Sequence, residues 1–216
     1  MFTGIVEEKG TIKSIKKTGD AIEMTIQAPK IVEDIHLGDS IAVNGVCLTV
    51  TTFDKHTFSV DLMPETVKAT SLRDLTIGSK VNLERAMAAN GRFGGHFVSG
   101  HVDGIGTIIS KKPISNAVYY EIKADEELLR YMLLKGSVTV DGTSLTIFGL
   151  NNKSFTISLI PHTLSETILG EKSQGDVVNI ECDILGKYIE KFLSKGQMED
   201  TRSTITEAFL EENGYK

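Results

Sequence analysis

The sequence predicts a mainly β protein that consists of two similar domains and a helical tail. Three observations lead to this fold class. A long stretch of sequence occurs twice, both copies contain segments in which apolar and polar residues alternate, and a helical pattern follows the second copy only.

The duplication is read from aligned segments in a fixed order. Residues 37–50 match residues 134–147 at six of 14 positions, and residues 58–87 match 155–184 at ten of 30. Residues 1–12 match 97–108 at five of 12 after a shift of one residue. Unrelated sequences would match at about one position in 17. We therefore expect two similar domains rather than a solenoid of short repeats.

Each copy is expected to be rich in β-strands. Residues 39–54 and 56–63 alternate in polarity and are enriched in β-branched side chains. The pairs Asn44-Gly45 and Asp141-Gly142 predict turns between strands. Short helices fit residues 125–134 and, less well, 29–36. Many short strands with regular turns indicate a sandwich or a barrel, and we place the domain boundary near residues 88–96.

The tail has no counterpart in the first copy. After residue 184, one apolar stripe of a helix carries Ile184, Tyr188, Ile189, Phe192 and Leu193. Residues 204–207 form a capping-box pattern before a second short helix. The stripe must be buried against the protein's own domains or against another subunit.

Composition excludes several classes of function. The net charge of −6 argues against binding to a nucleic-acid backbone. No apolar run approaches the roughly 20 residues of a membrane helix, and the first residues do not resemble a signal peptide. Two cysteines form no disulfide framework, and five histidines lack metal-binding spacing. We expect a cytoplasmic protein without a metal site.

A few positions differ between the copies in a way that suggests chemistry. Cys47 occupies the position of Ser144, although an isolated cysteine is usually a small buried side chain. His101 occupies the position of Ile5, so the second copy has an imidazole suited to proton transfer or to a surface hydrogen bond. Asp183 replaces Ala86. Residues 63–66 and 161–164 are typical of turns in the first place, and contact of their backbone groups with the edges of a planar heterocycle is the second interpretation.

The motifs "MFTGIVEE", "NGVCLTV", "GGHFVSGHVDG", "DGTSLTI" and "LIPHTL" closely resemble riboflavin synthases of the α-chain type, along the whole chain. The resemblance implies two six-stranded Greek-key β-barrels from an internal duplication, with domains 1–90 and 91–184 that each bind lumazine. It also implies a trimerisation tail, 185–216, and a homotrimer whose active sites form between subunits. The resemblance also suggests lumazine synthase as a further protein partner.

The implied reaction is a transferase reaction, a dismutation of two molecules of 6,7-dimethyl-8-ribityllumazine. One molecule gives a four-carbon unit to the other, which yields riboflavin and 5-amino-6-ribitylamino-2,4(1H,3H)-pyrimidinedione, the last step of riboflavin biosynthesis. No metal or organic cofactor is implied. Two identical substrates with different fates would explain two similar pockets with different polar groups.

The resemblance also assigns site residues. Cys47, His101, Ser40 and Ser144 are the candidate catalytic residues. One lumazine is expected to contact Gly4, Ile5, Val6, Cys47, Leu48, Thr49, Asp61, Leu62, Met63, Pro64, Glu65 and Thr66. The other is expected to contact Gly100, His101, Val102, Lys135, Ser144, Leu145, Thr146, Ile160, Pro161, His162, Thr163, Leu164, Ser165 and Asp183.

Two alternatives remain at this point. A non-enzymatic lumazine or flavin carrier of the antenna type would share the fold but lack turnover. A flavoprotein reductase would need a nucleotide-binding domain, and the sequence contains no βαβ pattern for one.

Overall fold

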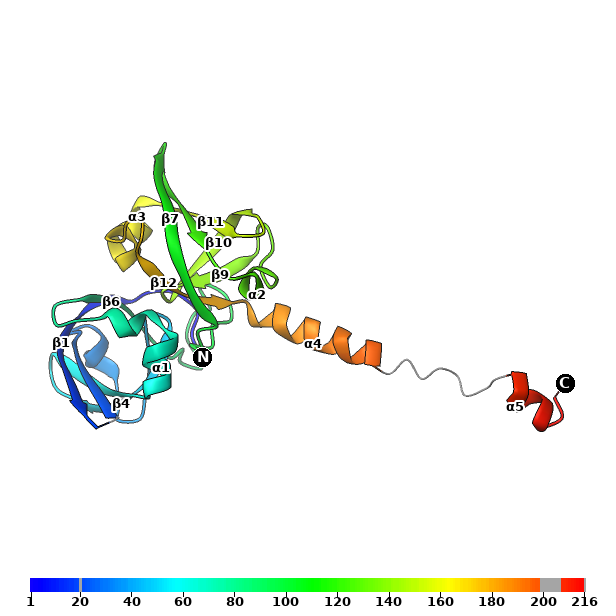
Figure 1. Cartoon of the computed structure of the whole chain (residues 1–216). Helices are drawn as coiled ribbons and strands as arrows, with labels where there is room; N and C mark the ends of the chain where they lie inside the picture. Colours follow the sequence, from blue (N-terminus) through cyan, green and yellow to red (C-terminus); the bar gives the residue numbers. More distant parts are fainter. Residues whose placement is uncertain (20, 199–206, 216) are drawn as a thin grey trace. The chain divides into compact units, whose positions relative to one another are not determined.

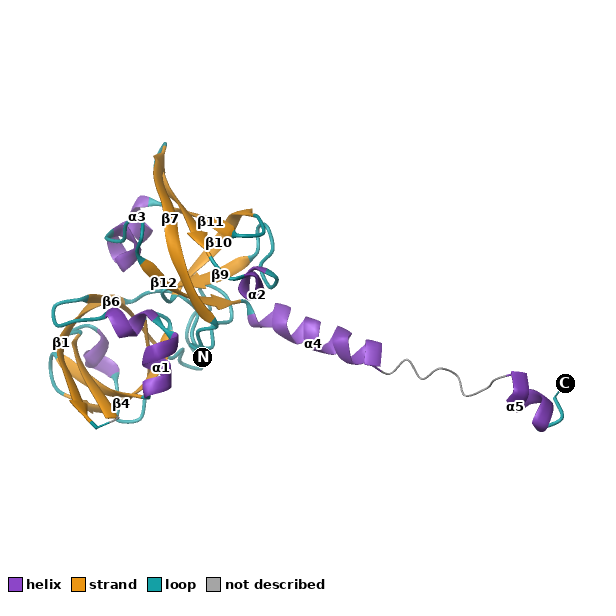
Figure 2. Cartoon of the chain, viewed as in Figure 1, coloured by secondary structure: helices purple, strands orange, loops and turns teal. Residues whose placement is uncertain are grey.

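The structure is a computed structural model that describes residues 1–19, 21–198 and 207–215, without the side chains of residues 194–198. It consists of two compact units, residues 1–184 and 185–216. The first unit contains both copies of the repeat (Figure 1). Figure 2 shows that strands dominate this unit and that its helices are short.

Each copy closes into a six-stranded antiparallel barrel. The first barrel contains β1 (Glu8–Thr18), β2 (Ala21–Gln27), β3 (Ser40–Val43), β4 (Val46–Phe53), β5 (Thr57–Leu62) and β6 (Lys80–Arg85). The second contains β7 (Gly104–Ile114), β8 (Ala117–Lys123), β9 (Ser137–Val140), β10 (Thr143–Leu150), β11 (Ser154–Leu159) and β12 (Val177–Cys182). The strand order, β1-β2-β5-β4-β3-β6, recurs in the second copy, which confirms the expected fold class. Closure leaves neither barrel with an unpaired edge.

The alternation of polarity determines which side chains fill each barrel. In β4, Val46, Leu48 and Val50 are buried inside, whereas Cys47 and Thr49 face outward. Each barrel therefore has its own apolar core, with Phe58 at 0% exposure in the first and Phe155 at 0% in the second.

The predicted turns are present between β3 and β4 and between β9 and β10. Asn44 and Gly45 have φ of 48° and 81°, and Asp141 and Gly142 have 44° and 77°. Two consecutive positive values are typical of the type I′ turn that joins neighbouring antiparallel strands.

The predicted helices are shorter than expected. Helix α2 spans only Glu126–Leu129, and residues 29–36 contain a 3-10 turn, η1, at Ile31–Asp34. The segments expected as turns instead begin helices, α1 (Pro64–Ala69) and α3 (Pro161–Glu166), because proline at the first helical position has no amide hydrogen to leave unpaired. The 3-10 turns η2 (Ser71–Asp74) and η3 (Ile168–Gly170) follow them.

Two asparagines join the barrels symmetrically. Asn82 of β6 accepts a hydrogen bond from Ile168 N at 2.8 Å, and Asn179 of β12 accepts one from Ser71 N at 2.7 Å. Their amide nitrogens donate to the Asp141 and Asn44 carbonyls, both at 2.8 Å. All these residues are buried, so a buried network of hydrogen bonds connects the two barrels.

The second unit contains α4 (Ile184–Met198), which starts at the last residue of the first, and α5 (Glu207–Glu212). Four residues of the predicted apolar stripe lie on α4 and are exposed: Tyr188, Ile189, Phe192 and Leu193. The Tyr188 and Phe192 rings stack with centroids 6.5 Å apart. Most of the expected capping box at 204–207 lies outside the described residues. Among the described residues, no helix is long and apolar enough to cross a membrane.

Candidate functional site

Each barrel is preceded by an extended leading segment, residues 1–7 before the first and 97–103 before the second. The two segments meet at an antiparallel bridge between Phe2 and Val98. Each then runs along the opposite barrel. The Gly4 carbonyl accepts a hydrogen bond from Ser144 N at 2.7 Å, and the Gly100 carbonyl accepts one from Cys47 N at 2.8 Å.

Both contacts require glycine. Gly4 and Gly100 have φ of 77° and 81°, in the left-handed region. A Cβ atom on Gly4 would lie 2.6 Å from Ser144 Cβ, and one on Gly100 would lie 2.6 Å from Cys47 Cβ. The backbone of each leading segment therefore lies directly against a candidate catalytic residue.

Two glutamates at equivalent positions anchor the leading segments to their own barrels. The Glu84 carboxylate accepts hydrogen bonds from Thr3 N at 2.6 Å, Thr3 Oγ1 at 2.9 Å and Gly4 N at 2.9 Å. Glu181 makes the same three contacts with Ser99 and Gly100. Burial raises the pKa of Glu84, and the hydrogen bonds from Thr3 and Gly4 oppose that shift.

These contacts bear on one expectation about the substrate pockets. The sequence grouped residues 4–6 with Cys47, and residues 100–102 with Ser144. The structure exchanges the two segments, because Gly4 contacts Ser144 and Gly100 contacts Cys47. Val102 also packs against the core of the first barrel. The alignment of the copies could not reveal this exchange, since it compares equivalent positions and not contacts.

The side chain of Ser144 is hydrogen-bonded to a histidine that the sequence analysis did not name as a candidate site residue. His96 Nδ1 lies 2.7 Å from Ser144 Oγ, and His96 Nε2 lies 3.2 Å from Thr139 Oγ1. Burial lowers the pKa of His96, and the charge of Asp183 opposes this shift. The predicted residues Ser144 and Asp183 are thus near the same imidazole. One feature of the sequence could have identified His96, because it precedes the second copy and has no equivalent in the first.

The corresponding place in the first barrel is apolar. Cys47 is half-buried and packs with Phe2, Ala42 and Val98. His101 follows Gly100 and is exposed, and its backbone nitrogen donates a 3.2 Å hydrogen bond to Ser99 Oγ. The structure therefore brings Cys47 and the backbone next to His101 together.

Lys135 lies at the turn before β9 with φ of 69°. Its ammonium group is 4.4 Å from the centroid of the Phe148 ring, and its backbone nitrogen donates to Ile147 O. Ser144, Thr146 and Phe148 all belong to β10, so Lys135 is close to the strand that carries Ser144.

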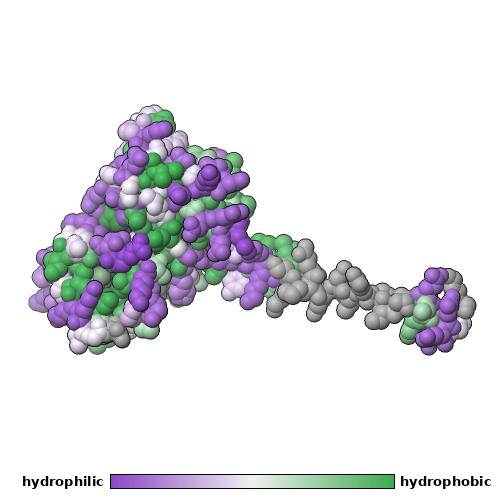
Figure 3. Space-filling model, viewed as in Figure 1, coloured by the Kyte–Doolittle hydropathy of each residue, from purple (hydrophilic) through white to green (hydrophobic). Residues whose placement is uncertain are grey.

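The remaining predicted residues lie at equivalent ends of two strands. Residues 61–66 cover the end of β5 and the start of α1, and residues 160–165 follow β11 into α3. Met63 and Ile160 are exposed there, at 67% and 55%. Figure 3 shows hydrophobic groups interspersed with hydrophilic ones on the viewed face of the barrels.

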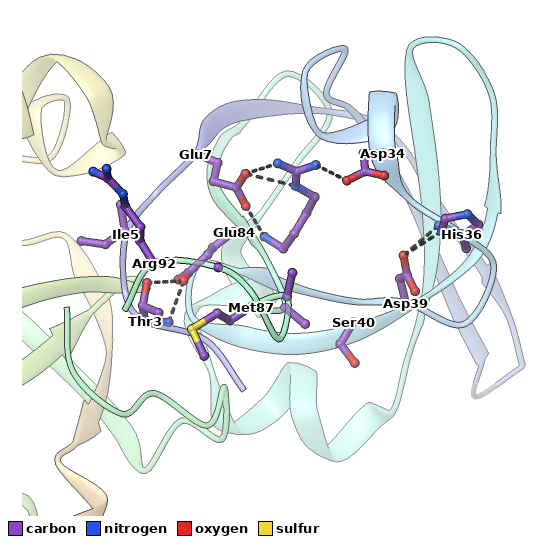
Figure 4. A pocket seen from close by; sticks show the side chains of 14 residues that line it. Thr3, Ile5, Glu7, Asp34, His36, Asp39, Ser40, Glu84, Met87 and Arg92 are labelled. Carbon is purple, nitrogen blue, oxygen red and sulfur yellow. Dashed lines mark hydrogen bonds and ion pairs between the residues drawn. The ribbon is translucent and has the colours of Figure 1, made fainter. Parts of the chain in front are cut away.

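A cavity of about 470 Å³ reaches from the first leading segment to the first barrel (Figure 4). Two predicted residues, Ile5 and Ser40, line it together with Thr3 and Glu84. One wall is an ion-pair cluster in which Arg85 Nε donates to Glu7 at 3.0 Å and Arg85 Nη1 lies 3.4 Å from Asp34. The cavity therefore has charged groups on one wall and lies beside Ser40.

Comparisons with known proteins agree with the duplicated architecture. A sequence family described as the lumazine binding domain matches residues 3–86 and again 99–183. Riboflavin synthases of Bacillus subtilis and Actinobacillus pleuropneumoniae are 66% and 54% identical to the chain over the full length of both partners. A crystal structure of LumP with riboflavin has a TM-score of 0.77 at 30% identity, over 84% of this chain and 99% of LumP. LumP with 6,7-dimethyl-8-(1'-D-ribityl) lumazine gives 0.75 at 28%, over 84% of this chain and 98% of that one.

Proposed function

The chain belongs to the riboflavin synthase family and carries its lumazine-binding domain twice, and from this we propose how the two barrels divide the work. The enzyme is a transferase that converts two molecules of 6,7-dimethyl-8-ribityllumazine into riboflavin and a pyrimidinedione. The two substrate molecules are chemically identical but have opposite roles, as donor and acceptor of four carbons.

The observation that supports a division of roles is the exchange of leading segments between unequal barrels. In the proposal, one lumazine binds to the first barrel against residues 47–49, 61–66 and 100–102. The other binds to the second barrel against residues 144–146, 160–165 and 4–6, with Lys135 and Asp183. Each pocket would then be built from both copies of the repeat.

The polar groups differ at the two pockets. Cys47 lies among apolar neighbours, whereas Ser144 is hydrogen-bonded to His96. In the proposed mechanism, Ser144 Oγ takes a proton from the 7-methyl group of the bound lumazine and gives its own proton to His96 Nδ1. The resulting carbanion is delocalised into the heterocycle, so a modest base is sufficient. His101 and Ser40 are proposed to act beside Cys47 at the other pocket.

The assembly and location are also part of this proposal. We propose that residues 1–90 and 91–184 act as lumazine-binding domains and that residues 185–216 form a homotrimer through the exposed face of α4. Active sites would form between the first barrel of one subunit and the second barrel of its neighbour. Cys47 and Cys182 form no disulfide, which is compatible with a reducing cytoplasm. Association with lumazine synthase stays a prediction.

The test is to incubate the purified chain with 6,7-dimethyl-8-ribityllumazine alone and to follow riboflavin by absorbance. We expect one riboflavin for every two lumazines consumed. Tight binding without product would instead identify a lumazine carrier.

A further inference from the structure

The two copies differ at a pair of residues that face each other across neighbouring strands. In the first barrel, Ala42 of β3 is opposite Cys47 of β4. In the second, Thr139 of β9 is opposite Ser144 of β10 at the equivalent register. Both positions of the pair have therefore changed together, from a methyl group and a thiol to two hydroxyl groups.

The surroundings of the pair change in the same way. Ala42 and Cys47 pack with Phe2 and Val98, which are apolar. The two hydroxyl groups of the second barrel instead contact opposite nitrogens of one imidazole, with Ser144 Oγ at 2.7 Å from Nδ1 and Thr139 Oγ1 at 3.2 Å from Nε2 of His96. His96 has no equivalent in the first copy, so the whole chain of three groups is specific to the second barrel.

We propose that Thr139 is a positioning residue that accepts the Nε2 hydrogen of His96 and so leaves Nδ1 free to receive the proton of Ser144. This inference rests on the proposed role of Ser144 in the riboflavin synthase reaction. It adds a residue whose effect on the substrate is indirect, through His96.

The tautomer decides whether His96 can act as a base toward Ser144. A neutral imidazole has one N–H group and one acceptor nitrogen. When Nε2 carries the hydrogen, Nδ1 accepts the hydrogen bond of Ser144 and can take its proton. When Nδ1 carries the hydrogen, it can only donate to Ser144. The distances allow both arrangements, and the proposal commits to the first.

The environment suits this role. Burial favours the neutral ring, and the charged group that acts on His96 is Asp183, at the end of β12. Thr139 is 1% exposed and is held between two strands, opposite Ser144 on one side and Glu181 on the other. Its branched side chain has few rotamers in a strand, so Oγ1 is fixed in front of Nε2.

The experiment combines kinetics with the protonation state of one ring. Thr139→Val removes the hydroxyl and keeps the shape, Thr139→Ser keeps the hydroxyl, and Thr156→Val on β11 makes the same change elsewhere in the barrel. General acid–base assistance contributes about 10²- to 10⁴-fold to a rate, so a misdirected base should lower kcat by about tenfold to 100-fold. We expect this for Thr139→Val with KM changed less than about twofold, and activity close to wild type for the other two variants.

Nitrogen NMR of histidine-labelled protein supplies the second measurement, with the His96 signals assigned by their loss in His96→Gln. The wild type should show the hydrogen on Nε2, and Thr139→Val should show a mixture of tautomers. A wild-type ring with its hydrogen on Nδ1 overturns the proposal, as does wild-type kcat in a folded Thr139→Val. If that variant does not fold, the wild-type tautomer and the activity of Thr139→Ser still decide. Failure of the proposed function is distinct, because the wild type would then form no riboflavin whatever the tautomer.

Discussion

Replacement of Gly100 by alanine tests whether the second leading segment holds Cys47 in place. The added Cβ would lie 2.6 Å from Cys47 Cβ and 2.8 Å from Phe2 Cε2. Carbon atoms in contact prefer 3.5–4.0 Å, so the segment must move away from β4 by about 1 Å. The 2.8 Å hydrogen bond from Cys47 N to Gly100 O would then be lost.

Two contributions to the free energy of unfolding can be estimated. The lost hydrogen bond contributes about 1 kcal/mol. A side chain at φ of 81° costs about 1–2 kcal/mol. Gly100→Ala should therefore destabilise the protein by at least about 2–3 kcal/mol. A misplacement of about 1 Å at a reacting group can cost about 10²-fold in rate, so turnover should fall by at least about tenfold.

Gly78→Ala is the matched control. Gly78 also has a left-handed backbone, with φ of 93°, but a Cβ there would meet no atom within 4 Å. It should show only the backbone cost of about 1–2 kcal/mol, with turnover unchanged. The two variants would be compared by their urea midpoints and by initial rates of riboflavin formation. Equal midpoints, together with wild-type turnover in Gly100→Ala, would refute the idea that this close contact positions Cys47.

Four further results are expected. Cys47→Ser should lose most turnover yet still bind lumazine in a fluorescence titration, and an unchanged rate would remove Cys47 from the mechanism. Because burial holds the pKa of His96 below its ordinary value of 6.5, kcat/KM should fall only on the acid side of pH 6.5, and His96→Gln should abolish that limb of the profile. Burial raises the pKa of Glu84 in the folded state, so its contribution to stability is fully present below the unfolded pKa and is lost as pH rises through the folded pKa. Glu84→Gln should therefore flatten the dependence of the unfolding midpoint on pH just above the ordinary carboxyl range, and an unchanged slope would contradict this assignment. Truncation after Asp183 should yield monomers by sedimentation, whereas trimers that persist would mean that α4 does not assemble the chain.

Much of the fold was predictable because the same local chemistry appears twice. The Asn44-Gly45 and Asp141-Gly142 pairs identified the tight turns, and alternation in residues 46–50 identified the inward face of β4. The helix expected at 125–134 was too long, since the chain leaves the helix after Leu129 and reaches a left-handed backbone at Lys135. Apolar content alone could not indicate where that helix ends.

The candidate site was predictable by residue type more than by geometry. Ser144 was identified because it differs from Cys47. His96 was missed because it has no counterpart with which to be compared. Glu84 and Glu181 were missed for the opposite reason. They are identical in the two copies, and the candidate residues were sought where the copies differ, although each glutamate anchors a leading segment. Contacts between the copies depend on the packing of the two barrels, which a comparison of equivalent positions does not describe.

The exchange of leading segments also limits how the duplicated chain could be divided. A polypeptide with only one copy would carry Gly4 or Gly100 but not the strand that the glycine contacts. In the proposed arrangement of the pockets, two such half-length chains would have to associate before either possessed a complete pocket, each supplying a leading segment to the other. Fusion of two copies into one chain makes this pairing independent of protein concentration. Fusion also allows the sequences of the two leading segments to differ, with isoleucine after Gly4 and histidine after Gly100.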